Sequence, residues 1–209
     1  MNRRTYELTL TSVLLGLVIL LAAVPSLGYI QLPFFPVSIT IIHIPVLIAG
    51  VFGSRKMTIY LGLAFGLSSL AVALTRSSMF LDPLFTSPLV SVLPRLILGL
   101  ILIDLLKLTN ITKRLEKTKL LSLALYFFIA TIIHSVLVLA AMYYTAKTGW
   151  YIDILGTKDI ISEWILTETA PIKFVYGIVI SNGLFEAIFA TVIGVPIAKA
   201  LQVSVGRLK

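Results

Sequence analysis

Four ionisable side chains stand inside strongly apolar segments of this sequence. They are His43, Arg95, His134 and Glu186, and Asn182 lies one helical turn before Glu186. Ionisable groups are costly inside a membrane-length apolar segment, so those found there usually serve a function. A guanidinium stays charged and offers a fork of donors that fits a carboxylate or a phosphate. Together the five residues favour a polar pocket that binds a small molecule with an anionic group.

Each of these residues also has a structural interpretation. Arg95 and Glu186 could form an internal ion pair between two helices, or a substrate could displace Glu186 from Arg95. His43 and His134 could each make a hydrogen bond between helices. The two histidines and the carboxylate lie on separate segments without the spacing of metal ligands, so we expect no metal and no cofactor. Because the chain has no cysteine and no Gly-rich phosphate loop, we expect neither an enzyme nor nucleotide hydrolysis by this chain itself.

The elements that would position these residues are membrane helices. The 209 residues are 58% hydrophobic and only 12% charged, whereas soluble domains are about 25% charged. A transmembrane helix needs about 20 apolar residues, so six such helices with short loops fill the chain. We therefore expect an all-α membrane protein with one six-helix transmembrane domain over residues 1–209. The predicted spans are 6–27, 37–53, 57–74, 88–108, 119–145 and 174–201.

The second predicted span is short and contains Pro45. We expect it to be kinked or partly unwound, and therefore buried in protein rather than exposed to lipid. At about 1.5 Å per residue, the polar residues on the different spans lie about 9 to 18 Å below the outer ends of their helices. This common level is what a pocket open to the outside needs.

Lys and Arg residues predict the orientation in the membrane. Most of the 17 flank the helix ends on the side of the two termini, and Arg76, Lys147, Lys158 and Lys173 are on the other side. Since short cytoplasmic loops carry the excess of Lys and Arg, we expect both termini in the cytoplasm. The net charge of +8 is then a topology signal rather than a nucleic-acid-binding surface.

The outer loops are rich in aromatic residues. Tyr29, Phe34, Phe80 and Trp150 fall in three different loops. They could form an interfacial belt, because tyrosine and tryptophan are enriched at membrane surfaces. They could also belong to lids that close over the pocket, which is the interpretation we favour and which makes these four residues candidate substrate contacts.

Small residues at four-residue spacing predict close helix packing. Gly62 and Gly66 show this spacing on the third span, and Ser12 and Gly16 show it on the first. The first span is otherwise as apolar as lipid. We therefore expect Ser12 and Gly16 to form a docking face for a partner protein.

In several segments the chain resembles the substrate-binding S components of energy-coupling-factor (ECF) vitamin transporters. The segments 37–50 and 62–69 are similar to the second and third helices of the pantothenate-specific type, 93–99 to its fourth helix and 182–187 to its sixth. Ser12 and Gly16 stand where relatives often carry alanines that contact the coupling subunit.

This resemblance implies a multi-pass protein of a prokaryotic plasma membrane, built as an S-component bundle. It implies capture of a vitamin, pantothenate by preference, from the outside. It further implies delivery inward when the chain docks on a module of one transmembrane coupling subunit and two ATPase subunits. A carboxylate, hydroxyls and an amide on the vitamin agree with one arginine, one asparagine and two histidines.

Other functions stay open at this point. The chain could bind another vitamin of the riboflavin or pyridoxine type, for which the loop aromatics would provide stacking. It could also be a stand-alone ion-coupled transporter, a membrane enzyme that acts on lipid, or a scaffold without a ligand. A secondary transporter usually has internal repeats, which this sequence does not show. Convergent polar residues argue against a scaffold.

Overall fold

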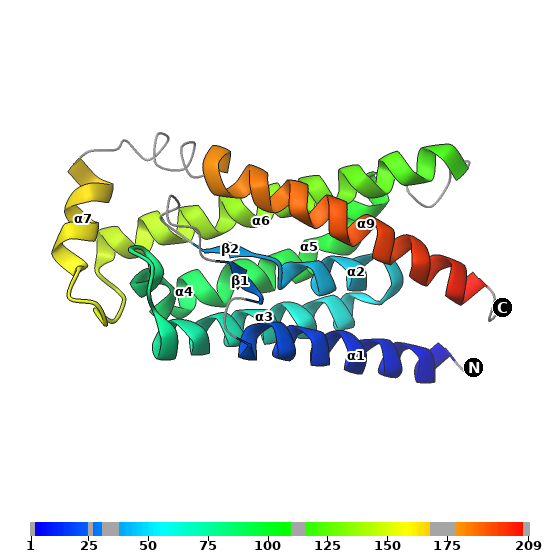
Figure 1. Cartoon of the computed structure of the whole chain (residues 1–209), viewed down its shortest axis with the longest axis horizontal. Helices are drawn as coiled ribbons and strands as arrows, with labels where there is room; N and C mark the ends of the chain where they lie inside the picture. Colours follow the sequence, from blue (N-terminus) through cyan, green and yellow to red (C-terminus); the bar gives the residue numbers. More distant parts are fainter. Residues whose placement is uncertain (1–2, 25–26, 31–37, 110–115, 168–178, 207–209) are drawn as a thin grey trace.

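The computed structural model describes residues 3–24, 27–30, 38–109, 116–167 and 179–206. Its helices are α1 (Arg3–Ala23), α2 (His43–Phe52), α3 (Arg55–Arg76), α4 (Pro88–Ser91), α5 (Leu93–Leu108), α6 (Glu116–Thr148), α7 (Lys158–Thr167) and α9 (Leu184–Gly206). Shorter elements are the strands β1 (Tyr29–Ile30) and β2 (Ile39–Thr40), the 3₁₀ helix η1 (Asp82–Thr86) and the π-helical turn η2 (Val179–Gly183). The long helices run side by side, with both ends of the chain at one end of the bundle and α7 at the other (Figure 1).

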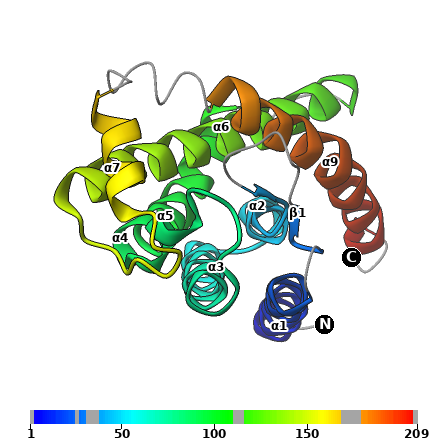
Figure 2. The same cartoon turned by 60° about the vertical axis from the view of Figure 1, so that its left-hand side comes forward.

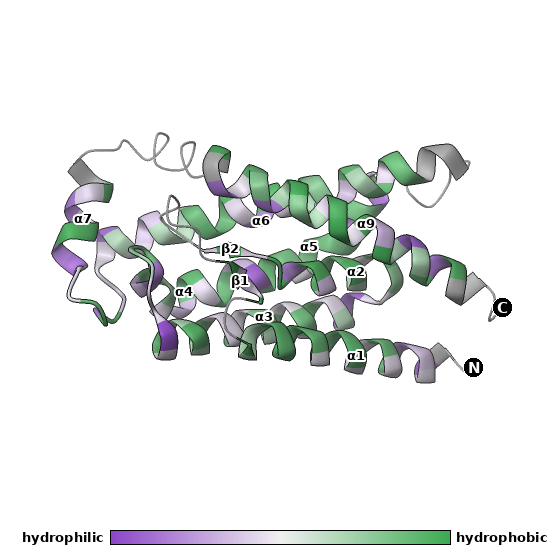
Figure 3. Cartoon of the chain, viewed as in Figure 1, coloured by the Kyte–Doolittle hydropathy of each residue, from purple (hydrophilic) through white to green (hydrophobic). Residues whose placement is uncertain are grey.

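Five of the helical segments in the described part are long and apolar enough to cross a membrane. They are Arg4–Ala23, Arg55–Arg76, Pro88–Leu108, Leu120–Thr148 and Leu184–Val203. Apolar residues dominate these segments, while hydrophilic residues gather near the ends of the bundle, on α7 and around β1 (Figure 3). The chain is therefore a multi-pass membrane protein. Six crossings, and which end faces the cytoplasm, stay predictions.

The second predicted span contains only the ten-residue helix α2, preceded by strand β2. Every residue from His43 to Gly50 is buried. Figure 2 shows α2 in the middle of the molecule, where it contacts α1, α3, α5, α6 and α9. A short, partly non-helical and buried segment is thus confirmed. Pro45 does not kink α2, because it lies in the first turn of this helix, where a proline costs no hydrogen bond.

The segment between α1 and α2 contains a small antiparallel hairpin that the sequence did not predict. Tyr29 pairs with Thr40, and Ile30 pairs with Ile39. Strands of two residues have no hydrophobic alternation that could reveal them. The hairpin matters because it directs Tyr29 and Thr40 into the interior of the bundle. Phe34 lies between the strands, outside the described residues.

Helices α3 and α5 pack through glycines. A Cβ atom on Gly62 would lie 2.5 Å from the backbone oxygen of Arg95, and one on Gly99 would lie 2.5 Å from that of Thr58. One turn after Gly62, a Cβ on Gly66 would lie 2.8 Å from Val92 Cα. The predicted packing face of Gly62 and Gly66 is confirmed, and its backbone contact holds α5 at a fixed distance from α3.

Two further predictions about the helices need adjustment. The fifth span is longer than predicted, since α6 runs from Glu116 to Thr148. The sixth begins in the described part with the π-helical turn η2, which widens the helix by one residue per turn just before α9. The third outer loop contains helix α7, which the sequence did not predict because its ten residues lie among loop-like polar and aromatic residues.

The glycine contact predicts a stability difference between two alanine variants. Gly62→Ala should lower the thermal unfolding temperature in detergent, because forced overpacking costs about 1–3 kcal/mol and exceeds the helix propensity that alanine gains. Gly16→Ala is the matched control, since nothing lies within 4 Å of a Cβ at Gly16. Equal unfolding temperatures for the two variants would contradict the close packing of α3 and α5.

Candidate functional site

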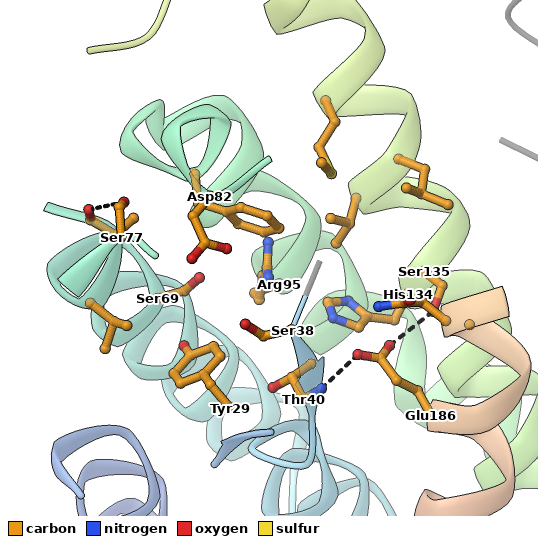
Figure 4. A pocket seen from close by; sticks show the side chains of 18 of the residues that line it. Tyr29, Ser38, Thr40, Ser69, Ser77, Asp82, Arg95, His134, Ser135 and Glu186 are labelled. Carbon is orange, nitrogen blue, oxygen red and sulfur yellow. Dashed lines mark hydrogen bonds between the residues drawn. The ribbon is translucent and has the colours of Figure 1, made fainter. Parts of the chain in front are cut away.

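A cavity lies at the level of the hairpin, between α3, η1, α5, α6 and the η2–α9 segment. Its empty volume is about 770 Å³, which includes open space at its mouth. The polar residues that line it are Tyr29, Ser38, Thr40, Ser69, Arg76, Ser77, Asp82, Arg95, His134, Ser135, Asn182 and Glu186 (Figure 4). Apolar residues, mainly from α3 and α6, complete the wall.

The cavity brings together most of the residues that the sequence singled out. Arg95, His134, Asn182, Glu186 and Tyr29 all line it, although they come from five different elements. Asn182 in η2 and Glu186 in α9 share one face, as their four-residue spacing predicted. The convergence itself is a structural finding. The role of each residue in binding stays a proposal.

Arg95 is the main positive charge deep in the cavity wall. Its side chain is only 2% exposed, and its guanidinium lies 5.0 Å from the ring centre of Phe65 and 5.3 Å from that of Phe85. Nη1 donates a hydrogen bond to the backbone oxygen of Val90. That oxygen lacks a helical donor because Pro94, four residues later, has no N–H.

The ion pair between Arg95 and Glu186, one of the two alternatives left open by the sequence, is not formed in this structure. Within the described ranges, no carboxylate lies within 4.0 Å of the Arg95 guanidinium nitrogens, and Nε has no hydrogen-bond partner. Ring faces attract a cation only weakly compared with the cost of removing its water. The guanidinium therefore has donors and charge left over for an anion in the cavity.

Glu186 is instead bound to neutral groups. Its Oε1 accepts a hydrogen bond of 2.7 Å from the backbone N–H of Thr40, and its Oε2 accepts one of 3.3 Å from Ser135 Oγ. These two contacts, drawn in Figure 4, fix the carboxylate between the hairpin and α6. Carboxylate oxygens have further lone pairs, so Glu186 can still accept a hydrogen bond from a ligand hydroxyl or amide.

The two histidines lie one behind the other. His134 lines the cavity, while His43 is fully buried behind it, with ring centres 5.8 Å apart. His43 Nε2 lies 3.2 Å from Thr131 Oγ1. His43 thus supports His134 and does not reach the cavity in this structure. Within the described residues, no cluster of three metal-binding side chains is present.

Asp82 and Thr40 are site residues that the sequence analysis did not single out. Asp82 begins η1, and its Oδ2 accepts hydrogen bonds from the backbone N–H groups of Ser78 and Met79, at 3.0 and 2.9 Å. Burial raises the pKa of Asp82 above its usual range. Thr40 Oγ1 is buried without a hydrogen-bond partner among the described residues. Ser38 directly precedes β2 and Thr40 lies within it, so their alternation can be recognised only once the strand is known.

Two of the predicted loop aromatics lie away from the cavity. Phe80 packs edge-on against Trp164, with ring centres 5.8 Å apart. Trp150 is 71% exposed and does not line the cavity. Phe34 is outside the described residues. Substrate contact by these three residues stays a prediction.

The predicted docking residues lie on an open helix face. Ser12 and Gly16 are both exposed on α1, and only 17% of the apolar window of this helix is buried. No atom of the described chain lies within 4 Å of a Cβ built on Gly16. The face is therefore accessible to lipid or to a partner.

Comparison with known proteins identifies the family. A family model described as the substrate-specific component of ECF transporters matches residues 7–198, which is nearly the whole chain. A comparison with curated proteins found no matching sequence. The match includes every helix that forms the cavity, and so this chain belongs to the family of ECF transporter substrate-specific components.

Proposed function

We propose that this chain captures pantothenate from outside the cell in the Arg95 cavity. As a family member it is a transport subunit rather than an enzyme, with a vitamin as substrate and an ECF module as partner. The choice of pantothenate rests on one observation, the buried Arg95 guanidinium that faces a cavity without an ion-pair partner in the described structure. An anionic vitamin supplies the missing charge.

The remaining polar groups divide the cavity into two ends. Arg95 suits the carboxylate, because a guanidinium binds carboxylates through two parallel hydrogen bonds. Glu186 lies at the hairpin end, where Thr40 and Ser135 hold it. Because a carboxylate only accepts hydrogen bonds, Glu186 suits the hydroxyl groups at the opposite end of pantothenate. His134 and Asn182 suit the amide between them.

Flat aromatic vitamins fit this cavity less well. Phe85 lines the cavity, but one face of its ring is turned to the Arg95 guanidinium and cannot stack on a ligand, and Phe65, whose ring also faces Arg95, does not line the cavity. Tyr29 is the other aromatic side chain among the cavity residues of the described structure. A riboflavin or pyridoxine type of substrate is therefore the second choice, to be tested in the same experiment.

Transport would follow docking on the coupling module in the plasma membrane of a prokaryote. The exposed α1 face with Ser12 and Gly16 supports contact with a transmembrane coupling subunit, because small residues let helix backbones approach closely. Two ATPase subunits in that module would supply the energy.

Calorimetry with a panel of vitamins tests the substrate. Pantothenate should bind, and Arg95→Ala should weaken binding at least about thirtyfold, since truncating one partner of a buried charge pair costs about 2–5 kcal/mol. The matched control is Arg55→Ala, whose guanidinium pairs with Asp104 at 2.7 Å outside the cavity and which should bind normally.

A pantothenate analogue with an alcohol in place of the carboxylate sharpens this test. It should bind weakly to the unchanged chain and lose nothing further in Arg95→Ala. Tight binding of riboflavin or pyridoxine instead would agree with the family assignment but exclude pantothenate as the substrate. Pantothenate binding that is unaffected by Arg95→Ala would contradict the assignment of its carboxylate to Arg95.

Glu186→Gln tests the hydroxyl end of the cavity. Glutamine keeps an acceptor for the Thr40 N–H but loses the charge, and a charge-assisted hydrogen bond exceeds a neutral one by about 1 kcal/mol. Pantothenate affinity should fall roughly five- to tenfold. A pantothenate analogue without the hydroxyl groups should bind the unchanged chain and Glu186→Gln with equal affinity. A uniform loss for both ligands would show that Glu186 acts only on the fold.

Gly16→Phe tests docking separately from binding. The bulky side chain should abolish uptake in vesicles that contain the coupling module and ATP, while calorimetric binding of the vitamin stays unchanged. Leu17→Phe, at an already large and exposed position on α1 that points away from the face of Ser12 and Gly16, is the control and should transport normally. Normal uptake by Gly16→Phe would place the docking face elsewhere.

A further inference from the structure

The connection between α6 and α7 exposes large apolar side chains at one end of the bundle. Trp150 is 71% exposed and Ile152 is 57% exposed, followed by Ile154 at 42% and Leu155 at 40%. At the start of α7, Ile160 adds another at 58%. A cluster of this kind on a protein surface usually marks contact with a membrane or a partner.

Hydrogen bonds hold the connection in shape. Lys158 Nζ donates to the backbone oxygen of Gly149 at 2.9 Å, and Tyr151 Oη donates to that of Lys158 at 3.1 Å. The Ile152 N–H donates to Thr86 Oγ1 in η1 at 2.7 Å, which ties the connection to the bundle. Tyr151 is buried between its exposed neighbours. The apolar side chains therefore face outward in an ordered segment.

The exposed cluster continues the lipid-facing surface of α6. Val136, Ala140 and Tyr144 follow one another at four-residue spacing on the exposed side of this helix, and the next turn leads to Trp150. The membrane-length segment Leu120–Thr148 has 29 residues. At 1.5 Å per residue it is about 43 Å long, which matches the roughly 40–45 Å of a bilayer with its headgroup layers. Trp150 then falls at the membrane surface.

We propose that the segment from Trp150 to Ile160 lies on the lipid bilayer at this end of the bundle. Its apolar side chains enter the boundary between headgroups and acyl chains, where tryptophan is enriched. Burial of apolar area at this boundary is what holds interfacial segments in place. In this arrangement Trp150 contacts lipid and not the vitamin, and the segment anchors η1, whose Asp82 and Phe85 line the cavity.

Tryptophan fluorescence in reconstituted vesicles tests this proposal, because the chain contains only two tryptophans. Trp164→Phe leaves Trp150 as the single emitter, and Trp150→Phe leaves Trp164, which packs on Phe80. In vesicles of phosphatidylcholine brominated close to the headgroup, Trp150 should lose most of its emission, and less with bromine at the chain end. Trp164 should be quenched far less.

If Trp164→Phe disturbs folding, the emission of Trp150 can be obtained as the difference between the emission of the unchanged chain and that of Trp150→Phe. Emission of Trp150 that resists brominated lipid but is quenched by acrylamide in the water would overturn the proposal. Shielding of Trp150 by added vitamin, without an effect of brominated lipid, would overturn it as well and would favour a lid. Both outcomes are independent of which vitamin binds.

Discussion

The cavity is organised around one buried positive charge. Arg95 is almost completely removed from solvent, and no carboxylate in the described ranges lies within ion-pairing distance of it. Removing an ion from water costs several kcal/mol even after the protein relaxes. Two aromatic rings and the Val90 oxygen offset only part of that cost. This incompletely compensated charge is the basis of the proposal that the cavity binds an anion.

The surrounding fold keeps this charge in place. Pro94 frees the Val90 oxygen that accepts from Arg95, and the glycine contacts between α3 and α5 set the position of the helix that carries the arginine. From the opposite side, the hairpin between α1 and α2 supplies the Thr40 N–H that holds Glu186. Glu186 is thereby held by its own partners, apart from Arg95. The proposed ligand, with an anion at one end and donors at the other, matches this separation of charges.

The polar residues within the long apolar segments could be predicted from the sequence. An ionisable side chain is costly in such a segment, so its presence there points to a site. Arg95, His134, Asn182 and Glu186 stand out against apolar neighbours, and all four line the cavity. Helices α1, α3, α5 and α6 could be predicted for the same reason, from their long apolar runs. His43 shows the limit of this reasoning, since a fully buried position behind His134 gives the same sequence signal as a position on the cavity wall.

The parts near the membrane surface could not be predicted in the same way. A two-residue strand leaves no periodic pattern in the sequence, so Thr40 and the neighbouring Ser38 could not be identified as cavity residues. Asp82 is an ordinary loop residue in the sequence, and only the fold of η1 brings it to the cavity. The location of an aromatic residue in these loops cannot be predicted from its type, because Tyr29 faces the cavity while Trp150 is exposed. At that level, aromatic residues line the cavity, pack against another ring or lie exposed.

Thermal unfolding of Arg95→Met tests the central claim most directly. If the guanidinium is held for a ligand, replacing it by an apolar side chain of similar length should leave the unfolding temperature of the ligand-free protein close to or above that of the unchanged chain. Pantothenate should then raise the unfolding temperature of the unchanged chain only, because a ligand stabilises the state that binds it. A large loss of stability in Arg95→Met together with a preserved pantothenate shift would contradict the account and make Arg95 a structural residue.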